Sequence, residues 1–253
     1  MVAVNKEESN STPTITVITV TRNAIDDLSI TVESVLAQQY SDVQFIVIDG
    51  GSTDGSIKLL EAHHDRIEYI SEADRGIYDA MNKALNKVRG EWMVFLNAGD
   101  RFANSDAIQT LVSETGGNLS LVYSDYMRPN SKNPKQLDLC SSRPLIGKYG
   151  IIQMICHQAI LFNVAHFPSF YDCNLRLCAD LDVLLNIYTK KNGEFRYLDK
   201  PLVVYQGGGV SESDYLSLHK EREIVIKRYF SRLVVLVNKI NHFRIRLRDA
   251  FCT

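Results

Sequence analysis

The sequence lacks the features of a membrane-spanning or secreted protein. No uninterrupted apolar run approaches the roughly 20 residues that a transmembrane helix needs. The first residues, MVAVNKEESNSTP, are polar and contain no apolar signal core. We therefore expect residues 1–13 to form a flexible tail and the protein to remain in the cytoplasm.

The cysteine pattern and the net charge exclude further classes. The five cysteines are scattered, odd in number, and form no close CxxC pair, which favours reduced, buried thiols over a disulfide framework or a zinc site. The net charge of −2 gives no indication of a nucleic-acid partner. No internal repeat or low-complexity linker divides the 253 residues, so one composite domain with a sizeable core is expected.

Strands and helices alternate through the first hundred residues. Near-continuous or β-branched apolar runs predict strands, and helical spacing of apolar residues predicts the helices between them. The predicted strands are 14–21, 43–50, 66–70 and 91–96, with helices directly after the first strand, at 55–63 and at 77–88. This alternation predicts an α/β fold with a mostly parallel central sheet and helices on both faces.

The second half of the chain is less regular. Its patterns predict strands at 119–126 and 157–163, a helix at 179–190 and two short strands on either side of Pro201. A glycine loop at 207–211 follows, and helices at 212–230 and 232–248 complete the sequence.

Polar residues follow the predicted parallel strands at the point where each strand ends. They are Asp49, Asp54, Asp74, Asn97 and Asp100. Sheets of this kind bind ligands at the carboxyl ends of their strands, so these side chains are expected to converge. An aspartate there can hold a divalent cation while water and diphosphate oxygens complete the coordination.

Each of these segments, taken alone, also has a purely structural interpretation. The loop DGGSTDG is as consistent with a turn and a helix N-cap as with a phosphate site. Asp79 and Asn82, on the helix 77–88, suit either a ligand or a buried hydrogen-bond network. Asp180, at the start of a helix, could be a general base or a capping residue, and His157 could be packed or functional.

The motifs in combination resemble family 2 glycosyltransferases. TVITVTRN, VIDGGSTDGS, SEADRGIYDAMNKAL, GEWMVFLNAGD, HQAILF, ADLDVLL and GGGVS occur in the order and spacing of that family, over residues 14–211. The resemblance implies the GT-A fold and an inverting transfer from a nucleotide-diphosphate sugar with Mg²⁺ or Mn²⁺. It also indicates the bacterial surface-polysaccharide branch, including colanic-acid, exopolysaccharide and O-antigen types.

The resemblance further implies a division of the chain and roles for single residues. Residues 14–115 would form the nucleotide-sugar half, 116–211 the acceptor half and 212–253 a basic helical extension. The implied donor-binding residues are Thr21, Asp49, Asp54, Asp74, Asp79, Asn82 and Asn97. Asp100 matches the metal ligand and Asp180 the catalytic base, while His157, Gly208 and Gly209 would border the acceptor.

Two motifs depart from the common family pattern. Where many members read DDGS, this chain reads Asp49-Gly50-Gly51-Ser52, so a uracil-specific donor cannot be assumed. Where many read DxDD, it reads Asn97-Ala98-Gly99-Asp100, which leaves one acid for the metal. The absence of a QxxRW motif and of membrane spans argues against a processive synthase.

The stretch 219–249 holds nine Lys and Arg residues against three acids, mixed with Leu, Val, Ile and Phe. This composition suits a helix, at 232–248, on an anionic membrane surface beside a lipid-linked glycan acceptor. A basic helix packed on the domain or at a homodimer contact is the alternative. For the whole protein the alternatives are a non-catalytic sugar-nucleotide or glycan-binding subunit and, less favoured because GxGxxG is absent, a nicotinamide-dependent enzyme.

Overall fold

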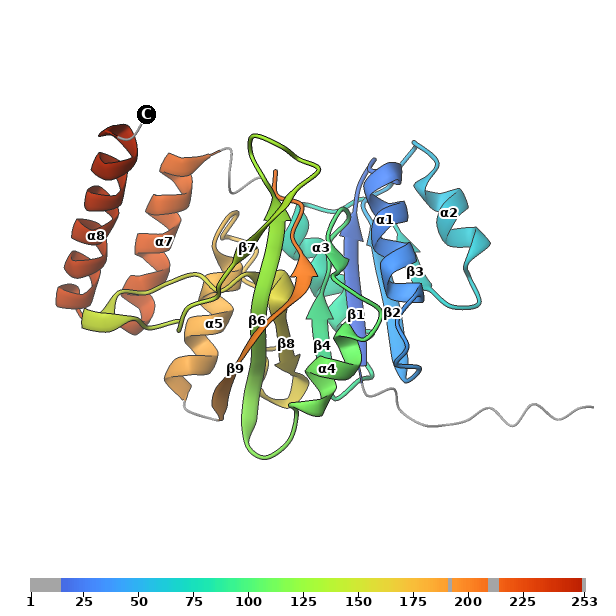
Figure 1. Cartoon of the computed structure of the whole chain (residues 1–253), viewed down its shortest axis with the longest axis horizontal. Helices are drawn as coiled ribbons and strands as arrows, with labels where there is room; N and C mark the ends of the chain where they lie inside the picture. The colour runs from blue at the N-terminus through green and yellow to red at the C-terminus, as the bar shows by residue number, and fades with distance from the viewer. Residues whose placement is uncertain (1–14, 191–192, 209–213, 252–253) are drawn as a thin grey trace, which may run out of the picture.

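A curled mixed β-sheet runs through the protein and carries helices on both faces (Figure 1). The structure is a computed structural model that describes residues 15–190, 193–208 and 214–251. The sheet of these residues has nine strands in the order β3-β2-β1-β4-β8-β6-β9-β5, with β7 paired to β6.

The N-terminal half forms the parallel part of the sheet, as the sequence predicts. Four strands pair in parallel and three helices connect them. They are β1 (Ile15–Thr21), α1 (Ile25–Leu36), β2 (Val43–Asp49), α2 (Ser56–Ala62), β3 (Glu68–Ser71), α3 (Ile77–Leu85) and β4 (Trp92–Phe95).

The second half adds antiparallel pairs. β8 is antiparallel to both β4 and β6, β9 is parallel to β6, and β5 is antiparallel to β9. The elements are β5 (Arg101–Phe102), α4 (Ala107–Ser113), β6 (Leu119–Pro129), β7 (Leu137–Cys140), β8 (Ile160–Asn163), α5 (Ala179–Lys190), β9 (Glu194–Val204), α7 (Tyr215–Tyr229) and α8 (Arg232–Phe251). Short 3-10 turns occupy Lys148–Gly150, His157–Ala159 and Val164–His166.

Two predicted elements differ in kind from the observed ones, and two differ in length: α3 ends at Leu85 and β6 extends to Pro129. The predicted strand 157–163 divides into a 3-10 turn and the shorter β8, so His157 lies in a turn. The two strands expected around Pro201 are one strand, β9, whose register against β6 shifts between the pairs Ser124–Leu198 and Asp125–Pro201. The irregular pairing accommodates a residue that has no backbone N–H to donate.

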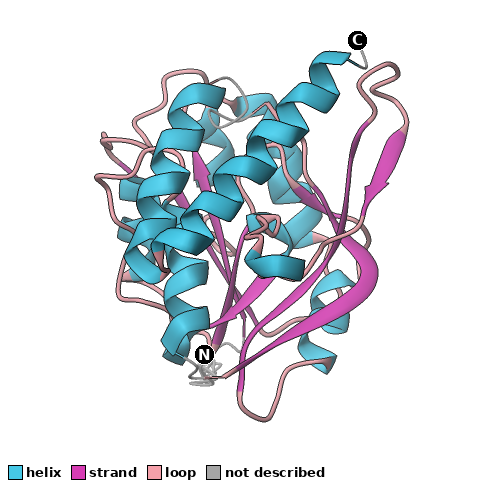
Figure 2. Ribbon diagram, turned by 90° about the vertical axis from the view of Figure 1, so that its left-hand side faces the viewer, coloured by secondary structure: helices cyan, strands magenta, loops and turns pink. Residues whose placement is uncertain are grey.

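Alternate residues of the central strands belong to two separate hydrophobic clusters, one on each face of the sheet. In β1, Ile18 and Val20 face one side of the sheet, whereas Ile15 and Val17 face the other. The first side packs against α3, α5, α7 and α8, and the second against α1, α2 and α4. Figure 2, a view from the α7–α8 end, shows helices in front of the strands.

The register of the parallel strands brings their carboxyl ends to one edge. Thr21 pairs with Asp49, and Asp49 with Ser71. The chain after β4 continues along β1, because Leu96 N–H donates to the Ile18 carbonyl at 2.8 Å. The loops that carry the predicted site residues therefore meet at this edge.

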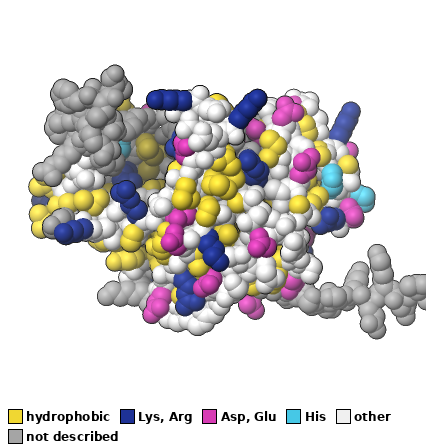
Figure 3. Space-filling model, in the orientation of Figure 1, with side chains coloured by type: hydrophobic (Ala, Val, Ile, Leu, Met, Phe, Trp, Pro, Cys, Tyr) yellow, Lys and Arg dark blue, Asp and Glu magenta, His cyan; other side chains and the backbone are white. Residues whose placement is uncertain are grey.

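The surface and the helices add two observations. Acidic and basic side chains are interspersed over the face shown in Figure 3, in keeping with the nearly balanced charge. Within the described ranges, no helix combines the length and the apolar character needed to cross a membrane.

Candidate active site

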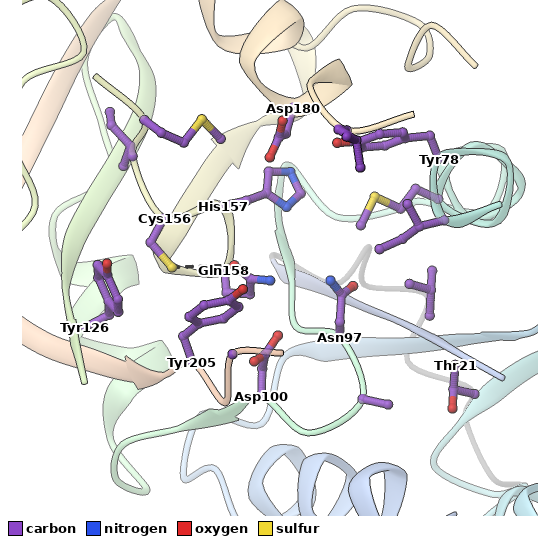
Figure 4. Close-up of a pocket in the computed structure, with 18 of the residues that line it drawn as sticks. Thr21, Tyr78, Asn97, Asp100, Tyr126, Cys156, His157, Gln158, Asp180 and Tyr205 are labelled. Carbon is purple, nitrogen blue, oxygen red and sulfur yellow. Dashed lines mark hydrogen bonds between the residues drawn. The ribbon is translucent and has the colours of Figure 1, made fainter. Parts of the chain in front are cut away.

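A cavity of about 640 Å³ lies at this edge of the sheet and is lined by five of the predicted site residues. They come from β1, from the turn after β4, from the turn before β8 and from the start of α5: Thr21, Asn97, Asp100, His157 and Asp180. In Figure 4, Asp180 and Asp100 occupy opposite sides of this cavity, and His157 and Gln158 lie between them.

Asp100 is a buried carboxyl on the cavity wall, only 4% exposed. Its Oδ1 accepts the Gln206 backbone N–H at 2.9 Å. Burial raises its pKa to about 7, a hydrogen bond from the Gln158 side chain opposes the shift, and the charge of Asp27 adds to it. At neutral pH this carboxylate is therefore poorly compensated and would gain from a cation.

The turn that presents Asp100 is fixed by α1. Thr31 Oγ1 donates to the Asp100 carbonyl at 2.7 Å and accepts the Gly99 N–H at 3.0 Å. Gly99 has φ +95°, a conformation that side-chain-bearing residues rarely adopt. An acid at position 99 of this turn would thus be strained.

Two buried oxygens on the cavity wall have no hydrogen-bond partner in the described part of the chain. They are Asn97 Oδ1 and Thr21 Oγ1. Buried polar groups are nearly always paired, so an orphaned pair at one cavity indicates a polar ligand there.

Asp180 lies in the first turn of α5, and its Oδ1 accepts the Leu181 N–H at 2.7 Å. Burial raises its pKa to about 6. Hydrogen bonds from Leu181 and the Tyr78 hydroxyl, together with the charge of Arg222, lower the pKa and so limit this rise. A carboxylate with a pKa near the working pH, facing a cavity, suits proton abstraction.

His157 lines the cavity but is embedded among aromatic rings. Its Nε2 pairs with the Tyr171 hydroxyl at 2.8 Å, and its ring stacks on Phe95 with centroids 4.9 Å apart. Burial lowers its pKa to about 3, so the imidazole is neutral at physiological pH. The sequence left open whether His157 is a packed residue or a site residue. In the structure it is packed among aromatic rings and also lines the cavity.

Asp49 and Asp54 do not line the cavity but organise the loop after β2. Asp49 is fully buried and accepts from Gly51 N–H at 3.0 Å, Ser52 N–H at 2.8 Å and Ser71 Oγ at 2.7 Å. Asp54 accepts Ser56 Oγ at 2.7 Å and the Ile25 N–H at 2.8 Å, ahead of α2 and at the start of α1. These hydrogen bonds, led by that from Ser56, hold the pKa of Asp54 below its usual value.

Asp74, Asp79 and Asn82 also lie outside the cavity lining and are held by local contacts. Asp74 Oδ1 accepts the Gly76 N–H at 2.9 Å. Asp79 pairs with Arg75 at 2.7 Å, and hydrogen bonds from Arg75 lower its pKa. Asn82 exchanges two hydrogen bonds with the Tyr171 backbone, at 2.9 and 2.7 Å.

The glycine loop is partly described. Gly207 lines the cavity, and the adjacent Gly208 has φ +76°. Gly209 lies outside the described residues.

The structure adds lining residues that sequence reasoning did not single out: Tyr126, Cys156, Gln158, Arg176 and Tyr205. Gln158 is adjacent to His157 in the motif HQAILF, which could have indicated it. Burial, with the charge of Asp100 second, raises the pKa of Cys156 to about 12, so this thiol stays protonated.

The donor atoms fit a hard divalent cation in part. Nowhere in the described ranges do three or more His, Cys, Asp or Glu side chains form a metal-binding group. Asp100 and the orphaned Asn97 Oδ1 nevertheless offer oxygen donors at one cavity. Mg²⁺ commonly takes one or two protein oxygens and fills its remaining positions with water and substrate phosphate, so this set is compatible with it.

Comparison with known proteins identifies the family. The model of glycosyl transferase family 2 matches residues 16–167, more than half of the chain, and the protein belongs to that family. It is thus a glycosyltransferase. An uncharacterised glycosyltransferase of Mycobacterium tuberculosis is 40% identical over 184 residues, which are 69% of each protein.

Solved structures of similar shape are GT-A glycosyltransferases. A mannosyltransferase from Pyrobaculum calidifontis, in complex with GDP-Man and Mn²⁺, has a TM-score of 0.63 at 16% identity, covering 87% of this chain and 64% of that one. Glucosyl-3-phosphoglycerate synthase from M. tuberculosis, with Mn²⁺, UDP and phosphoglyceric acid, has a TM-score of 0.62 at 16% identity, covering 85% and 78%. At these identities the likeness defines the fold, which is GT-A.

Proposed function

We propose that the chain transfers a sugar, with inversion, from a nucleotide-diphosphate sugar to a hydroxyl of a glycan acceptor in bacterial surface polysaccharide synthesis. The observation that carries this proposal is the cavity with Asp180 on one side and Asp100 on the other. One carboxylate is available for the acceptor proton and the other for the donor's diphosphate side. The structural neighbours were solved with GDP-Man or UDP, which supports a donor of the same class.

In this reaction Asp180 takes the proton of the acceptor hydroxyl as the oxygen attacks the anomeric carbon. Its hydrogen bonds from Leu181 and Tyr78 hold the carboxylate toward the cavity. The diphosphate departs on the opposite side of the anomeric carbon, so a single displacement inverts the configuration. Thr21 and Asn97 offer their unpaired oxygens to donor hydroxyl or N–H groups, or, for Asn97, to the cation.

Asp100 and Asn97 would hold Mg²⁺ or Mn²⁺, and the cation would stabilise the charge of the departing diphosphate. Mn²⁺ in both neighbouring structures supports a divalent ion. Full activity in EDTA after gel filtration would remove Asp100 from this role.

The proposal is tested by Asp180→Asn, assayed for transfer and for acceptor-free donor hydrolysis. We expect transfer to fall by about 10²–10⁴-fold, the usual contribution of a general base. Asp182→Asn is the matched control: Asp182 lies in the same helical turn, pairs with Arg228 at 3.0 Å and is not a lining residue of the cavity. Transfer by Asp180→Asn within a few-fold of the control would refute the base assignment.

The donor is identified by thermal-shift measurements with UDP, GDP, dTDP and CDP in the presence of Mn²⁺. We expect one or two of these nucleotides to raise the melting temperature selectively. If no nucleotide does so, the proposed donor class is wrong, and a non-catalytic glycan-binding role becomes the better explanation of the same fold.

We further propose that α8 docks on the cytoplasmic face of an anionic membrane, where the acceptor is lipid-linked. Leu233, Leu236 and Ile240 form a stripe at helical spacing and are 70%, 53% and 45% exposed. Arg232 precedes the stripe, Lys239 lies on the side toward α7 and pairs with Glu223 at 2.9 Å, and Val235, on the opposite side from the stripe, packs into the core. An exposed apolar stripe beside basic residues suits an anionic lipid surface.

The membrane proposal is tested by flotation with phosphatidylglycerol vesicles. Replacing the three stripe residues by serine leaves Val235 in place, so loss of flotation would report docking and not unfolding. Unchanged flotation would overturn the proposal. If the serine variant floats like the wild type but has a lower mass in solution, the stripe is a homodimer contact.

A further inference from the structure

We propose that Glu221 and Arg222, neighbours on α7, are positioning residues for the acceptor side of the active site. Glu221 fixes the backbone that leads into Asp180, and Arg222 fixes the loop that supplies the cavity wall at Met154–Cys156. The inference rests on the proposed function, because it assigns Asp180 to the acceptor proton.

Glu221 binds three successive backbone N–H groups just before α5. Its carboxylate accepts from Arg176 at 3.0 Å, Leu177 at 2.7 Å and Cys178 at 3.1 Å. Cys178 is the residue at the N-terminus of α5, because its carbonyl accepts the Asp182 N–H at 3.0 Å, and a carboxylate at this end also meets the positive end of the helix dipole. Arg176 and Leu177 line the cavity, and Asp180 follows two residues after the last N–H.

Arg222 holds the opposite strip of backbone. Its Nη2 donates to the Ile152 carbonyl, and Ile152 N–H donates to Asn238 Oδ1 of α8 at 2.8 Å. Asn238, 3% exposed, also donates to the Gly150 carbonyl at 3.0 Å. The segment 150–152 is thus held by both C-terminal helices two residues before the lining residues Met154, Ile155 and Cys156.

The charge environment of the Arg222 guanidinium connects it with the active site. Its Nε is buried and has no hydrogen-bond partner among the described residues. Among the same residues, the guanidinium group of Arg222 forms no ion pair within 4.0 Å. Burial lowers its pKa, and the groups whose charges oppose this shift are Cys178 and Asp180. A buried guanidinium is costly unless it compensates negative charge, and the charge of Asp180 contributes to that compensation.

The groups that act on Asp180 come from three elements. Tyr78 of α3, Tyr171 of the preceding loop and Cys178 all have pKa values raised by burial, so they are neutral near pH 7. Arg222 of α7 is the cation in this set. Removal of the Arg222 charge should therefore raise the pKa of Asp180.

The test uses Glu221→Gln, Arg222→Met and Arg222→Lys in the full chain, with Glu223→Gln as the matched control. Glu223 is the next acid along α7 and pairs with Lys239 at 2.9 Å, outside the cavity lining. Transfer kinetics are measured against donor and acceptor separately, with melting temperatures for each variant.

We expect Glu221→Gln to lower kcat or raise the acceptor KM by about tenfold to a hundredfold, because small displacements of a reacting group have effects of this size. The donor KM should stay within about twofold. Arg222→Met should in addition move the acid limb of the pH profile upward, and Arg222→Lys should restore its position. Glu223→Gln should leave all parameters near those of the wild type.

Three results would overturn the inference: wild-type kcat and acceptor KM in the folded Glu221 and Arg222 variants, an equal rise of the donor KM, or an unshifted acid limb in Arg222→Met. If Glu221→Gln does not fold, the comparison of Arg222→Met with Arg222→Lys decides alone. An Asp180→Asn variant assayed in parallel distinguishes a failure of the proposed function from a failure of the inference about Glu221 and Arg222. Its full activity would refute the proposed function, whereas its inactivity beside wild-type positioning variants would refute only the inference.

Discussion

Replacement of Asp100 by asparagine should stabilise the metal-free protein at neutral and alkaline pH. Burial raises the pKa of Asp100 from 3.8 to about 7. The neutral form of this carboxyl is therefore favoured by folding. Its contribution to stability is complete below about pH 4 and is lost as the pH rises through about 7.

The size of the effect follows from the shift. About three pKa units at ~1.4 kcal/mol each give an upper limit of roughly 4 kcal/mol for the cost of the charged form above pH 7. Asparagine is neutral at every pH and keeps an oxygen for the Gln206 N–H. Its amide group faces the Gln158 donor, which offsets part of the gain, so we expect about 2 kcal/mol.

The assay is urea unfolding in EDTA at pH 5, 6, 7 and 8. The difference in unfolding free energy between Asp100→Asn and wild type should grow with pH over this range. Asp106→Asn, at an exposed acid in the next loop, should change the unfolding free energy by less than about 0.5 kcal/mol throughout. Added Mn²⁺ should stabilise the wild type and not Asp100→Asn. A pH-independent difference, or a less stable variant at pH 8, would refute the reasoning.

Three further predictions follow from the same geometry. Because the pKa of Asp180 is raised to about 6 and the carboxylate is the active form, kcat/KM for the acceptor should fall about tenfold per pH unit below pH 6; a flat profile down to pH 5 would contradict this. His157→Phe should cost about 1–3 kcal/mol in urea unfolding, because the Tyr171 hydroxyl loses its partner, yet leave that acid limb unmoved, since the histidine is already neutral. A Cβ at position 50 would overlap Oδ2 of Asp74, so Gly50→Ala should turn the Asp74 side chain away from the loop after β2. If Asp74 binds the donor, nucleotide affinity measured by calorimetry should fall about tenfold, and unchanged affinity would show that Asp74 is not part of the donor site.

The sheet and its helices were largely predictable because their signals are local. Apolar runs such as 43–50 indicate a strand covered on both faces, and the observed β2 (Val43–Asp49) is buried over almost its whole length. The helix at 179–190 coincides with α5 (Ala179–Lys190). β9 was not predictable in this way, because its passage through Pro201 depends on a shifted pairing with β6, which is distant in sequence.

Local patterns predicted the candidate site as a set of strand ends, and the family resemblance added His157 and Asp180. Asp49 and Asp100 look alike in sequence, since each follows an apolar strand and accompanies glycine. In the structure Asp49 turns into its own loop and accepts from Gly51, Ser52 and Ser71, whereas Asp100 faces the cavity. The environment of Asp49 is mostly local, with Ser71 as its distant partner, whereas that of Asp100 is built by Gln206, which lies 106 residues further along the chain.

The sequence by itself determined the alternation of strands and helices, the family motifs and the edge of the sheet at which polar residues gather. Tertiary structure alone decided which acids face the cavity, gave Asp100 and Asp180 their raised pKa values, and brought α7 against the start of α5. The physical reason is that secondary structure follows from periodicity over a few residues. The direction, burial and charge environment of a side chain depend on which distant segments pack around it.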